Sequence, residues 1–205
     1  MLEGMLAGIE SGISILGPVG VFFAMLAETI FPPIPSELVM PLGGYVAYTT
    51  GQGIFGLILT IIAGTLGTTL GAVIIYMIAK IGGRGLVVRY GKMFFVDEKK
   101  IRVSEEWFKK HGSHAVFLCR MAPGLRELIS IPAGLAKMNL LKFLIYTFAG
   151  SFVWSAFLGS IGYFLADAWR TLDFMSLFNV VAAILLVVLV SYFVFMHFIR
   201  NKKKR

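Results

Sequence analysis

Long apolar runs, separated by short charged or proline-rich segments, dominate the chain. Three of them, residues 54–79, 143–166 and 174–199, contain no Asp, Glu, Lys or Arg. Each exceeds the roughly 20 residues that a membrane-spanning helix needs. The pattern therefore predicts three full transmembrane helices, Ile54–Ala79, Phe143–Ala166 and Phe174–Ile199.

Two further apolar segments are broken by proline and charge. The first covers residues 13–27, is interrupted at 28–37 and resumes over 38–48, and the second covers residues 115–136. Proline lacks a backbone donor and does not fit inside a continuous helix. Non-helical backbone is tolerated at membrane depth only inside protein or beside water. Both segments are therefore predicted to be re-entrant helical hairpins, each entering and leaving by the same side.

Basic residues predict the orientation. They occur throughout residues 80–110 and again in the tail 202–205. Cytoplasmic loops carry an excess of Lys and Arg, so we expect both regions on the cytoplasmic side of the cell (plasma or inner) membrane, and the two hairpins then enter from opposite sides. Residues 97–111 are predicted to form a basic amphipathic helix at the interface, ended by Gly112.

The two halves of the chain resemble each other. The segment Glu37-Leu-Val-Met-Pro-Leu-Gly43 is echoed by Glu127-Leu-Ile-Ser-Ile-Pro-Ala-Gly134, and residues 63–67 are echoed by 149–153, with a tyrosine downstream in both halves. Together with the opposed hairpins, this predicts an inverted repeat, an architecture of secondary transporters whose discontinuous segments build the substrate site near the midplane. Gly64, Gly67 and Gly71 are predicted to be helix-packing positions without a chemical role.

The predicted fold class is an all-α integral membrane protein with two opposed re-entrant hairpins and three full transmembrane helices, in one domain of residues 1–205. The parts are a first repeat at 17–80, a cytoplasmic basic segment at 81–111, a second repeat at 112–166, a C-terminal transmembrane helix at 174–199 and a basic tail at 200–205.

Composition agrees with a chain solvated by lipid. The chain is 58% hydrophobic and 15% charged, which leaves too little polar material to solvate a soluble domain of 205 residues. The net charge of +8 does not indicate nucleic-acid binding, because no basic residue precedes Lys80 and the basic residues flank apolar runs.

Cys119 is the only cysteine, which excludes an intrachain disulfide. The three histidines show no catalytic or metal spacing, so we predict no enzyme, catalytic residue, metal or cofactor.

A small set of charges falls within or beside the broken segments: Glu28, Glu37, Arg120, Arg126 and Glu127. A charge at membrane depth is costly and normally faces a cavity or a partner on a transport pathway. The alternative is that these residues lie at the interface or neutralise one another in a static core. We favour function for the first four, and simple pairing with a neighbouring arginine for Glu127.

The residue types suggest a division of roles. Arg120 and Arg126 are predicted to bind an anion or phosphate, because the planar guanidinium matches phosphate oxygens. Glu28 and Glu37 are predicted to couple protons, because a carboxylate in a poorly solvated cavity takes up a proton more readily. The secondary site residues are Glu127, Pro35, Ser36, Pro123 and Gly124.

The motifs around these charges resemble the DedA family, which is related to the VTT-domain membrane proteins. They are Glu28-x-x-x-Pro32-x-x-Pro35-Ser36-Glu37, Phe117-x-x-Arg120-x-x-Pro123-Gly124-x-Arg126, and Pro132-Ala133-Gly134-x-x-x-Met138 followed by Gly150 and Trp154. The resemblance covers residues 17–199. Met121 stands where an aromatic residue is common, and Glu37 where many members carry Asp.

The resemblance implies two opposed re-entrant hairpins and a role in membrane or envelope maintenance. It implies a transporter or flippase that moves an anionic lipid, either a polyprenyl phosphate carrier or a phospholipid, with proton coupling. It also implies functional roles for the acids at Glu28 and Glu37 and the arginines at Arg120 and Arg126. The substrate stays open between these lipids.

Other functions use the same residues. A proton-coupled carrier or channel for a small anion or ion needs the same charges but no lateral opening to lipid. A purely structural scaffold does not explain two acids and two arginines at chain breaks. The expected partners are membrane lipids with an anionic phosphate headgroup and protons, without nucleic acid, and homo-oligomerisation is left open.

Overall fold

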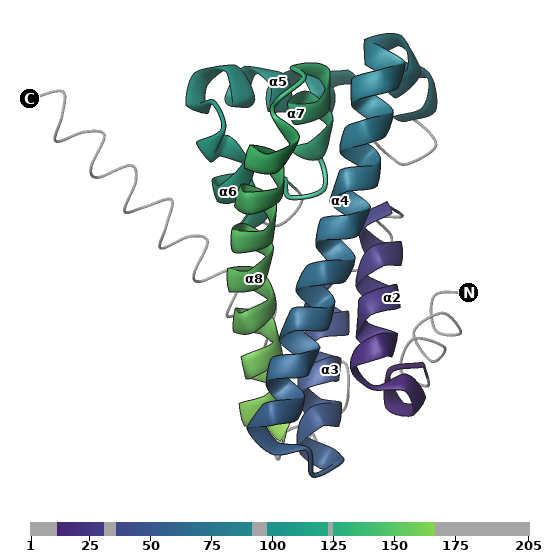
Figure 1. The fold of residues 1–205 in the computed structure, drawn as a ribbon, viewed down its shortest axis with the longest axis vertical. Helices are drawn as coiled ribbons and strands as arrows, with labels where there is room; N and C mark the ends of the chain where they lie inside the picture. Colours follow the sequence, from purple (N-terminus) through teal and green to yellow (C-terminus); the bar gives the residue numbers. More distant parts are fainter. Residues whose placement is uncertain (1–11, 31–35, 92–97, 123–124, 167–205) are drawn as a thin grey trace, which may run out of the picture. The chain divides into compact units, whose positions relative to one another are not determined.

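All regular structure in the described part of the chain is α-helical (Figure 1). The computed structural model describes residues 12–30, 36–91, 98–122 and 125–166. The helices are α2 (Pro18–Ile30), α3 (Ser36–Thr49), α4 (Gly53–Gly91), α5 (Glu98–His111), α6 (His114–Arg120), α7 (Ser130–Leu135) and α8 (Leu140–Phe164). The chain divides into two units after Phe164. The third predicted span, 174–199, and the basic tail lie outside the described residues.

Two of the predicted spans are confirmed as long apolar helices. Within the described residues, Gly53–Val87 of α4 and Leu140–Phe164 of α8 are long and apolar enough to cross a membrane. Helix α4 extends well past the predicted end at Ala79. It bends at Gly83, whose φ of 64° and ψ of −174° are readily adopted only by glycine. The bend lies just beyond the predicted end of the apolar span, near the start of the basic segment 81–111.

The outward faces of the two long helices are apolar. Large hydrophobic side chains more than one-third exposed on these faces include Ile54, Phe55, Ile58, Ile62, Leu66 and Leu70 of α4 and Leu141, Ile145, Phe148, Phe152 and Phe157 of α8. A contiguous apolar surface of this kind is unusual on a soluble monomer. It is the surface that a bilayer solvates.

Each broken segment is flanked by helices, as its pattern predicts. Helix α2 ends at Ile30 and α3 begins at Ser36, while α6 ends at Arg120 and α7 begins at Ser130. Glu28 therefore lies in the last turn of α2 and Glu37 in the first turn of α3. The break residues Pro35, Pro123 and Gly124 are outside the described residues.

The two halves of the chain interlock. Helix α3 packs against α8, and α7 packs against α4, so the second helix of each broken segment contacts the long helix of the other half. Helices α2 and α6 pack against α4 and α8 of their own halves, and α4 and α8 lie side by side (Figure 1). This exchange of partners brings the two broken segments to the same pair of long helices.

Glycines make the exchanged contacts close. Gly44 of α3 lies against the backbone of Gly159 and Tyr163 in α8, and Gly134 of α7 lies against the backbone of Tyr76 in α4. In both halves a Cβ at the glycine would overlap main-chain atoms of the long helix. The backbones therefore touch at corresponding positions in the two halves, next to the tyrosine that follows each repeated segment.

The predicted packing role of the α4 glycines is confirmed. A side chain at Gly67 would meet the Phe22 carbonyl of α2, and one at Gly71 would meet Thr29. Gly64 instead lies against the Met40 side chain of α3. The three glycines thus let α2 and α3 approach one long helix, as small residues do in membrane bundles.

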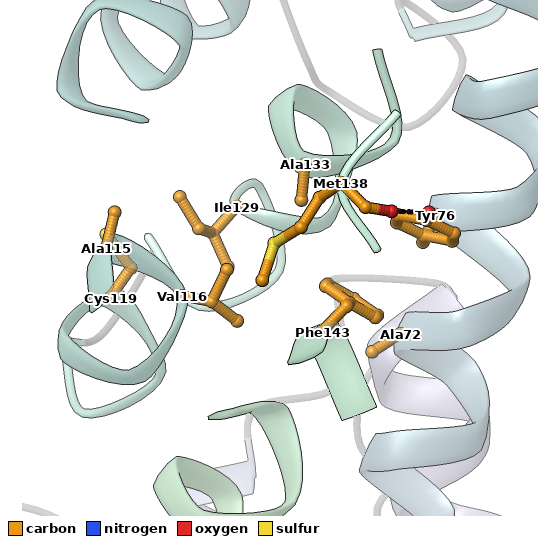
Figure 2. Packing of buried hydrophobic residues seen from close by; sticks show 9 residues of the cluster. All are labelled: Ala72, Tyr76, Ala115, Val116, Cys119, Ile129, Ala133, Met138 and Phe143. Carbon is orange, nitrogen blue, oxygen red and sulfur yellow. Dashed lines mark hydrogen bonds between the residues drawn. The ribbon is translucent and has the colours of Figure 1, made fainter. Parts of the chain in front are cut away.

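A buried cluster joins α4, α6, α7 and α8 (Figure 2). It contains Ala72, Tyr76, Ala115, Val116, Cys119, Ile129, Ala133, Met138 and Phe143. The Tyr76 ring stacks on Phe143 with 4.6 Å between centroids, and its hydroxyl donates a hydrogen bond to the Met138 carbonyl. This contact fixes the start of α8 against α4.

The predicted helix at residues 97–111 is confirmed as α5, Glu98–His111. Gly112 ends it with φ of 59°, and its amide donates to the Phe108 carbonyl over 2.8 Å. This is the left-handed glycine stop that the sequence predicts. Arg84 of α4 forms an ion pair with Glu105 of α5 at 2.9 Å.

The tightest glycine contact gives a stability prediction. Gly162 of α8 lies against the carbonyl and Cα of Pro41, main-chain atoms that have no freedom to move aside. Gly162→Ala should lower the free energy of unfolding by about 1–3 kcal/mol through overpacking, measured as thermal unfolding in detergent micelles. Gly85→Ala is the control, since a Cβ there meets open space and alanine favours the helix. Equal stability of the two variants would contradict the packing.

Candidate functional site

Arg126, itself buried, is the centre of a cluster of one buried and two partly buried carboxylates. It lies in the turn between α6 and α7, and only 6% of its side chain is exposed. Its Nη2 pairs with Glu28 Oε1 and lies 3.8 Å from Glu37 Oε2, and its Nε donates to Glu127 Oε1 over 2.6 Å. Glu28 and Glu37 come from the first broken segment and Arg126 from the second. The two breaks predicted from the sequence therefore meet at this cluster.

Helix α8 lines one side of the cluster. The Arg126 guanidinium carbon lies 5.6 Å from the centroid of the Trp154 ring. The Trp154 indole Nε1 donates to Ser36 Oγ over 3.5 Å, and the Ser36 hydroxyl donates to Glu37 Oε2 over 3.4 Å. Trp154 therefore holds both the arginine and, through Ser36, one of its carboxylates.

Arg120 has a different environment. It ends α6 and is 1% exposed, the largest fully buried side chain in the structure's described part. Its Nη2 donates to Ser130 Oγ over 2.6 Å. Its Nε and Nη1 have no hydrogen-bond partner among the described residues. The donors of a buried guanidinium are normally all bonded to acceptors. Arg120 is therefore a buried cation with two nitrogens that can still donate hydrogen bonds.

The two arginines approach the same stretch of α8. Arg120 Cβ lies close to Gly150, where any side chain would collide with it, while Arg126 lies over Trp154. Gly150 and Trp154 are four residues apart, about one helical turn or 6 Å of rise. Glu127 and Glu28 also lie close enough to Arg120 to interact with it electrostatically. The charges of both broken segments thus form one group.

The charge balance of this group is uneven. Three carboxylates, Glu28, Glu37 and Glu127, face two guanidinium groups, but all three contact Arg126. With all five groups ionised they carry one net negative charge, so uptake of one proton makes the group neutral. The arrangement can hold an anion at Arg120 and exchange a proton at the carboxylates around Arg126.

The structure brings most of the predicted site residues together and adds two more. Ser36 and Glu127 both contact the cluster, whereas Pro35, Pro123 and Gly124 lie outside the described residues. Sequence reasoning missed Ser130 as the partner of Arg120, because a contact across ten residues and a chain break has no periodic signal. It also assigned Trp154 no role in the site, although a tryptophan within an apolar span needs a partner for its indole N–H.

Buried charges packed beside two long apolar helices are the arrangement of an integral membrane protein, in which such charges mark transport pathways. The family model described as VTT domain matches residues 34–164. The chain therefore belongs to the VTT domain family, which confirms the resemblance to DedA proteins.

Curated relatives agree with this assignment. An alkaline phosphatase-like protein of Lactococcus lactis subsp. cremoris is 40% identical over 85% of this chain and 83% of its own. Undecaprenyl phosphate transporter A of Bacillus subtilis is 34% identical, covering 84% of this chain and 83% of its own. The protein of the same name in Staphylococcus aureus is 31% identical, covering 96% and 97%. No solved structure matches the chain.

Proposed function

We propose that this protein is a transporter that carries an anionic lipid, a polyprenyl phosphate or a phospholipid, across the cell membrane. The observation that carries the proposal is Arg120, a fully buried cation with two donor nitrogens unpartnered within the described chain. A guanidinium recognises phosphate oxygens through charge-assisted hydrogen bonds. The relatives named for undecaprenyl phosphate transport support a lipid phosphate as the substrate class.

The proposed architecture is an inverted repeat of two re-entrant hairpins that enter from opposite sides. The exchanged packing of α3 on α8 and of α7 on α4 supports it, as do the matching backbone contacts of Gly44 and Gly134. In this arrangement residues 80–111 and the C-terminus face the cytoplasm. The charged group then lies where the two hairpins meet, the position of substrate sites in inverted-repeat transporters.

Proton coupling follows from the charge balance. Arg126 is held by three carboxylates, and its positive charge is therefore unavailable to an anion while all three are ionised. Protonation of Glu28 or Glu37 removes one negative charge and weakens the hold on Arg126. The site then attracts an anionic headgroup more strongly, so the proton and the lipid bind together.

Flux measurements with purified protein in liposomes test the proposal. We expect movement of undecaprenyl phosphate across the bilayer that depends on the protein and increases with a pH gradient. Inorganic phosphate, measured in parallel, should not be transported. Transport of inorganic phosphate without lipid movement would instead identify a small-anion carrier, and absence of both fluxes would refute a phosphate transporter.

The proton acceptor can be tested by a single isosteric change. Coupling of one proton to each lipid makes a gradient of one pH unit worth about 1.4 kcal/mol, or about tenfold in accumulation. Glu28→Gln keeps a hydrogen-bonding group beside Arg126 but takes up no proton, so the accumulation of undecaprenyl phosphate should no longer respond to the gradient. Glu106→Gln, on the exposed face of α5, should respond as the wild type does. A normal response of Glu28→Gln would exclude Glu28 as the coupling residue.

A further inference from the structure

Four buried hydroxyl groups on the two long helices have no role in the site described so far. They belong to Thr68 and Thr69 of α4 and to Thr147 and Ser151 of α8, and each residue is at most 8% exposed. None of the four hydroxyls has a hydrogen-bond partner in the described parts of the chain. A buried hydroxyl without a partner is unfavourable, so these four groups are donors that a bound ligand would satisfy.

Other threonines of the same bundle behave differently. Thr65 donates to the Ile61 carbonyl over 2.7 Å, and Thr29 donates to the Met25 carbonyl over 2.8 Å. This bond to the carbonyl four residues earlier is the usual way in which a helical threonine satisfies its hydroxyl. Thr68, only three residues from Thr65, does not make it. Its hydroxyl is therefore not committed to its own helix.

The antiparallel pairing of α4 and α8 shows which residues of the two helices lie opposite one another. Phe143 of α8 stacks on Tyr76 of α4, and Gly159 lies beside Ile61, so α8 runs antiparallel to α4. Ser151 lies midway between the two α8 contacts.

The matching level on α4 is midway between Ile61 and Tyr76, at Thr68 and Thr69. Thr147 precedes Ser151 by four residues, which places it on the same face of α8, one turn away. The hydroxyl residues of the two helices therefore lie within about one helical turn of one another along the helix axes.

Arg120 reaches α8 at the same level. It lies against Gly150, and Gly150 is between the two hydroxyl residues of α8, three positions after Thr147 and one before Ser151. The Cβ and Cγ of Arg120 lie at this level, and its guanidinium carries the unpartnered Nε and Nη1 donors. Hydroxyls and guanidinium groups are both donors to phosphate oxygens, and a phosphate accepts several such bonds at once.

We propose that Thr68 and Thr69 of α4 and Thr147 and Ser151 of α8 form, with Arg120, the subsite that binds the phosphate group of the substrate. This deepens the proposed function and rests on it for the lipid as the source of the phosphate. Arg120 supplies the charge, and the hydroxyls supply neutral donors that complete the shell around the phosphate oxygens. Arg126 and its carboxylates lie about one turn along α8 from Arg120, and their protonation changes the net charge beside this subsite.

Isosteric variants test the subsite. The double variant Thr68→Val/Thr147→Val removes two hydroxyls and keeps the side-chain volume, and Thr65→Val is the matched control because its hydroxyl is bonded within α4. Binding of undecaprenyl phosphate and of inorganic phosphate is measured on the purified proteins in lipid nanodiscs. We expect the dissociation constant for the phosphate ligand to rise about tenfold for each hydroxyl removed, and Thr65→Val to bind as the wild type does.

The outcomes separate the subsite from the proposed function. Wild-type affinity for the lipid in the double variant overturns the subsite and leaves the transporter standing. Binding of inorganic phosphate alone, weakened by the double variant, supports the subsite and refutes the lipid substrate. If the wild type binds neither probe, both proposals fail.

Thermal unfolding of the same variants distinguishes binding from packing. Removal of an unpartnered buried hydroxyl relieves an unfavourable burial, so the melting temperature of Thr68→Val/Thr147→Val should equal or exceed that of the wild type. Thr65→Val loses a formed hydrogen bond and should not gain stability. A double variant that loses both affinity and melting temperature would show that the hydroxyls serve the fold, and would overturn the subsite.

Discussion

Arg120→Met is expected to reduce undecaprenyl phosphate flux by about 100-fold or more, while the protein stays at least as stable as the wild type. The substitution removes the charge and at least two charge-assisted hydrogen bonds to the phosphate, each worth about 1.5–3 kcal/mol. Stability is retained because burying the Arg120 cation is costly and no ion pair with the described carboxylates offsets that cost. Glu28 and Glu127 act on Arg120 only at longer range. Flux into liposomes and thermal unfolding in detergent measure the two effects.

The control is Arg102→Met on exposed α5, which should change neither quantity. Arg120→Lys, which keeps the charge but loses the planar donor fork, should insert normally and transport poorly. A melting temperature of Arg120→Met well below that of the wild type would mean that Arg120 holds the fold together, and the loss of flux would then say nothing about a substrate.

Arg126→Met, unlike Arg120→Met, is expected to cause a large loss of stability. The substitution leaves Glu28, Glu37 and Glu127 without their ion-pair partner, and breaking a buried ion pair from one side costs about 3–5 kcal/mol. The melting temperature should fall accordingly. Adding Glu28→Gln to Arg126→Met should recover part of the loss, because one of the uncompensated charges is removed, and the double-mutant cycle measures that coupling.

The exposed ion pair of Arg84 is the control for the effect of Arg126→Met on the melting temperature. Arg84 pairs with Glu105 at 2.9 Å, but half of its side chain is exposed, and exposed pairs contribute about 0–1 kcal/mol. Arg84→Met should therefore leave the melting temperature nearly unchanged. A similar fall for Arg84→Met and Arg126→Met would show that burial of the carboxylate cluster is not what makes Arg126 important.

These two predictions separate residues that the sequence presents as equivalent. Both arginines flank the same break, six residues apart, and both are expected to bind phosphate on the pattern alone. The structure gives Arg126 three carboxylate partners and gives Arg120 a single hydroxyl partner among the described residues. The difference depends on which helices from the other half of the chain lie beside each guanidinium, and no local pattern encodes that.

The sequence by itself determined the class of the protein. Runs of residues without charge, such as 54–79 and 143–166, are long enough to cross a bilayer, and lipid requires every backbone group in them to be bonded within the helix. Prolines and charges mark the breaks for the same reason. Glu28, Glu37 and Arg126 stand out because a charge in an apolar segment is expensive unless it has a partner, although the sequence does not say which partner.

Tertiary structure alone decided how the parts combine. Contacts between residues distant in the chain determine three features. They are the packing of α3 and α7 on the long helix of the other half, the different partners of Arg120 and Arg126, and the positions of Thr68 and Ser151 relative to each other along the two long helices. Hydrophobic periodicity reports only that a face is buried, not what covers it. Close backbone contacts at Gly44 and Gly134 fix the register of the helices, and that register determines which donors and carboxylates meet.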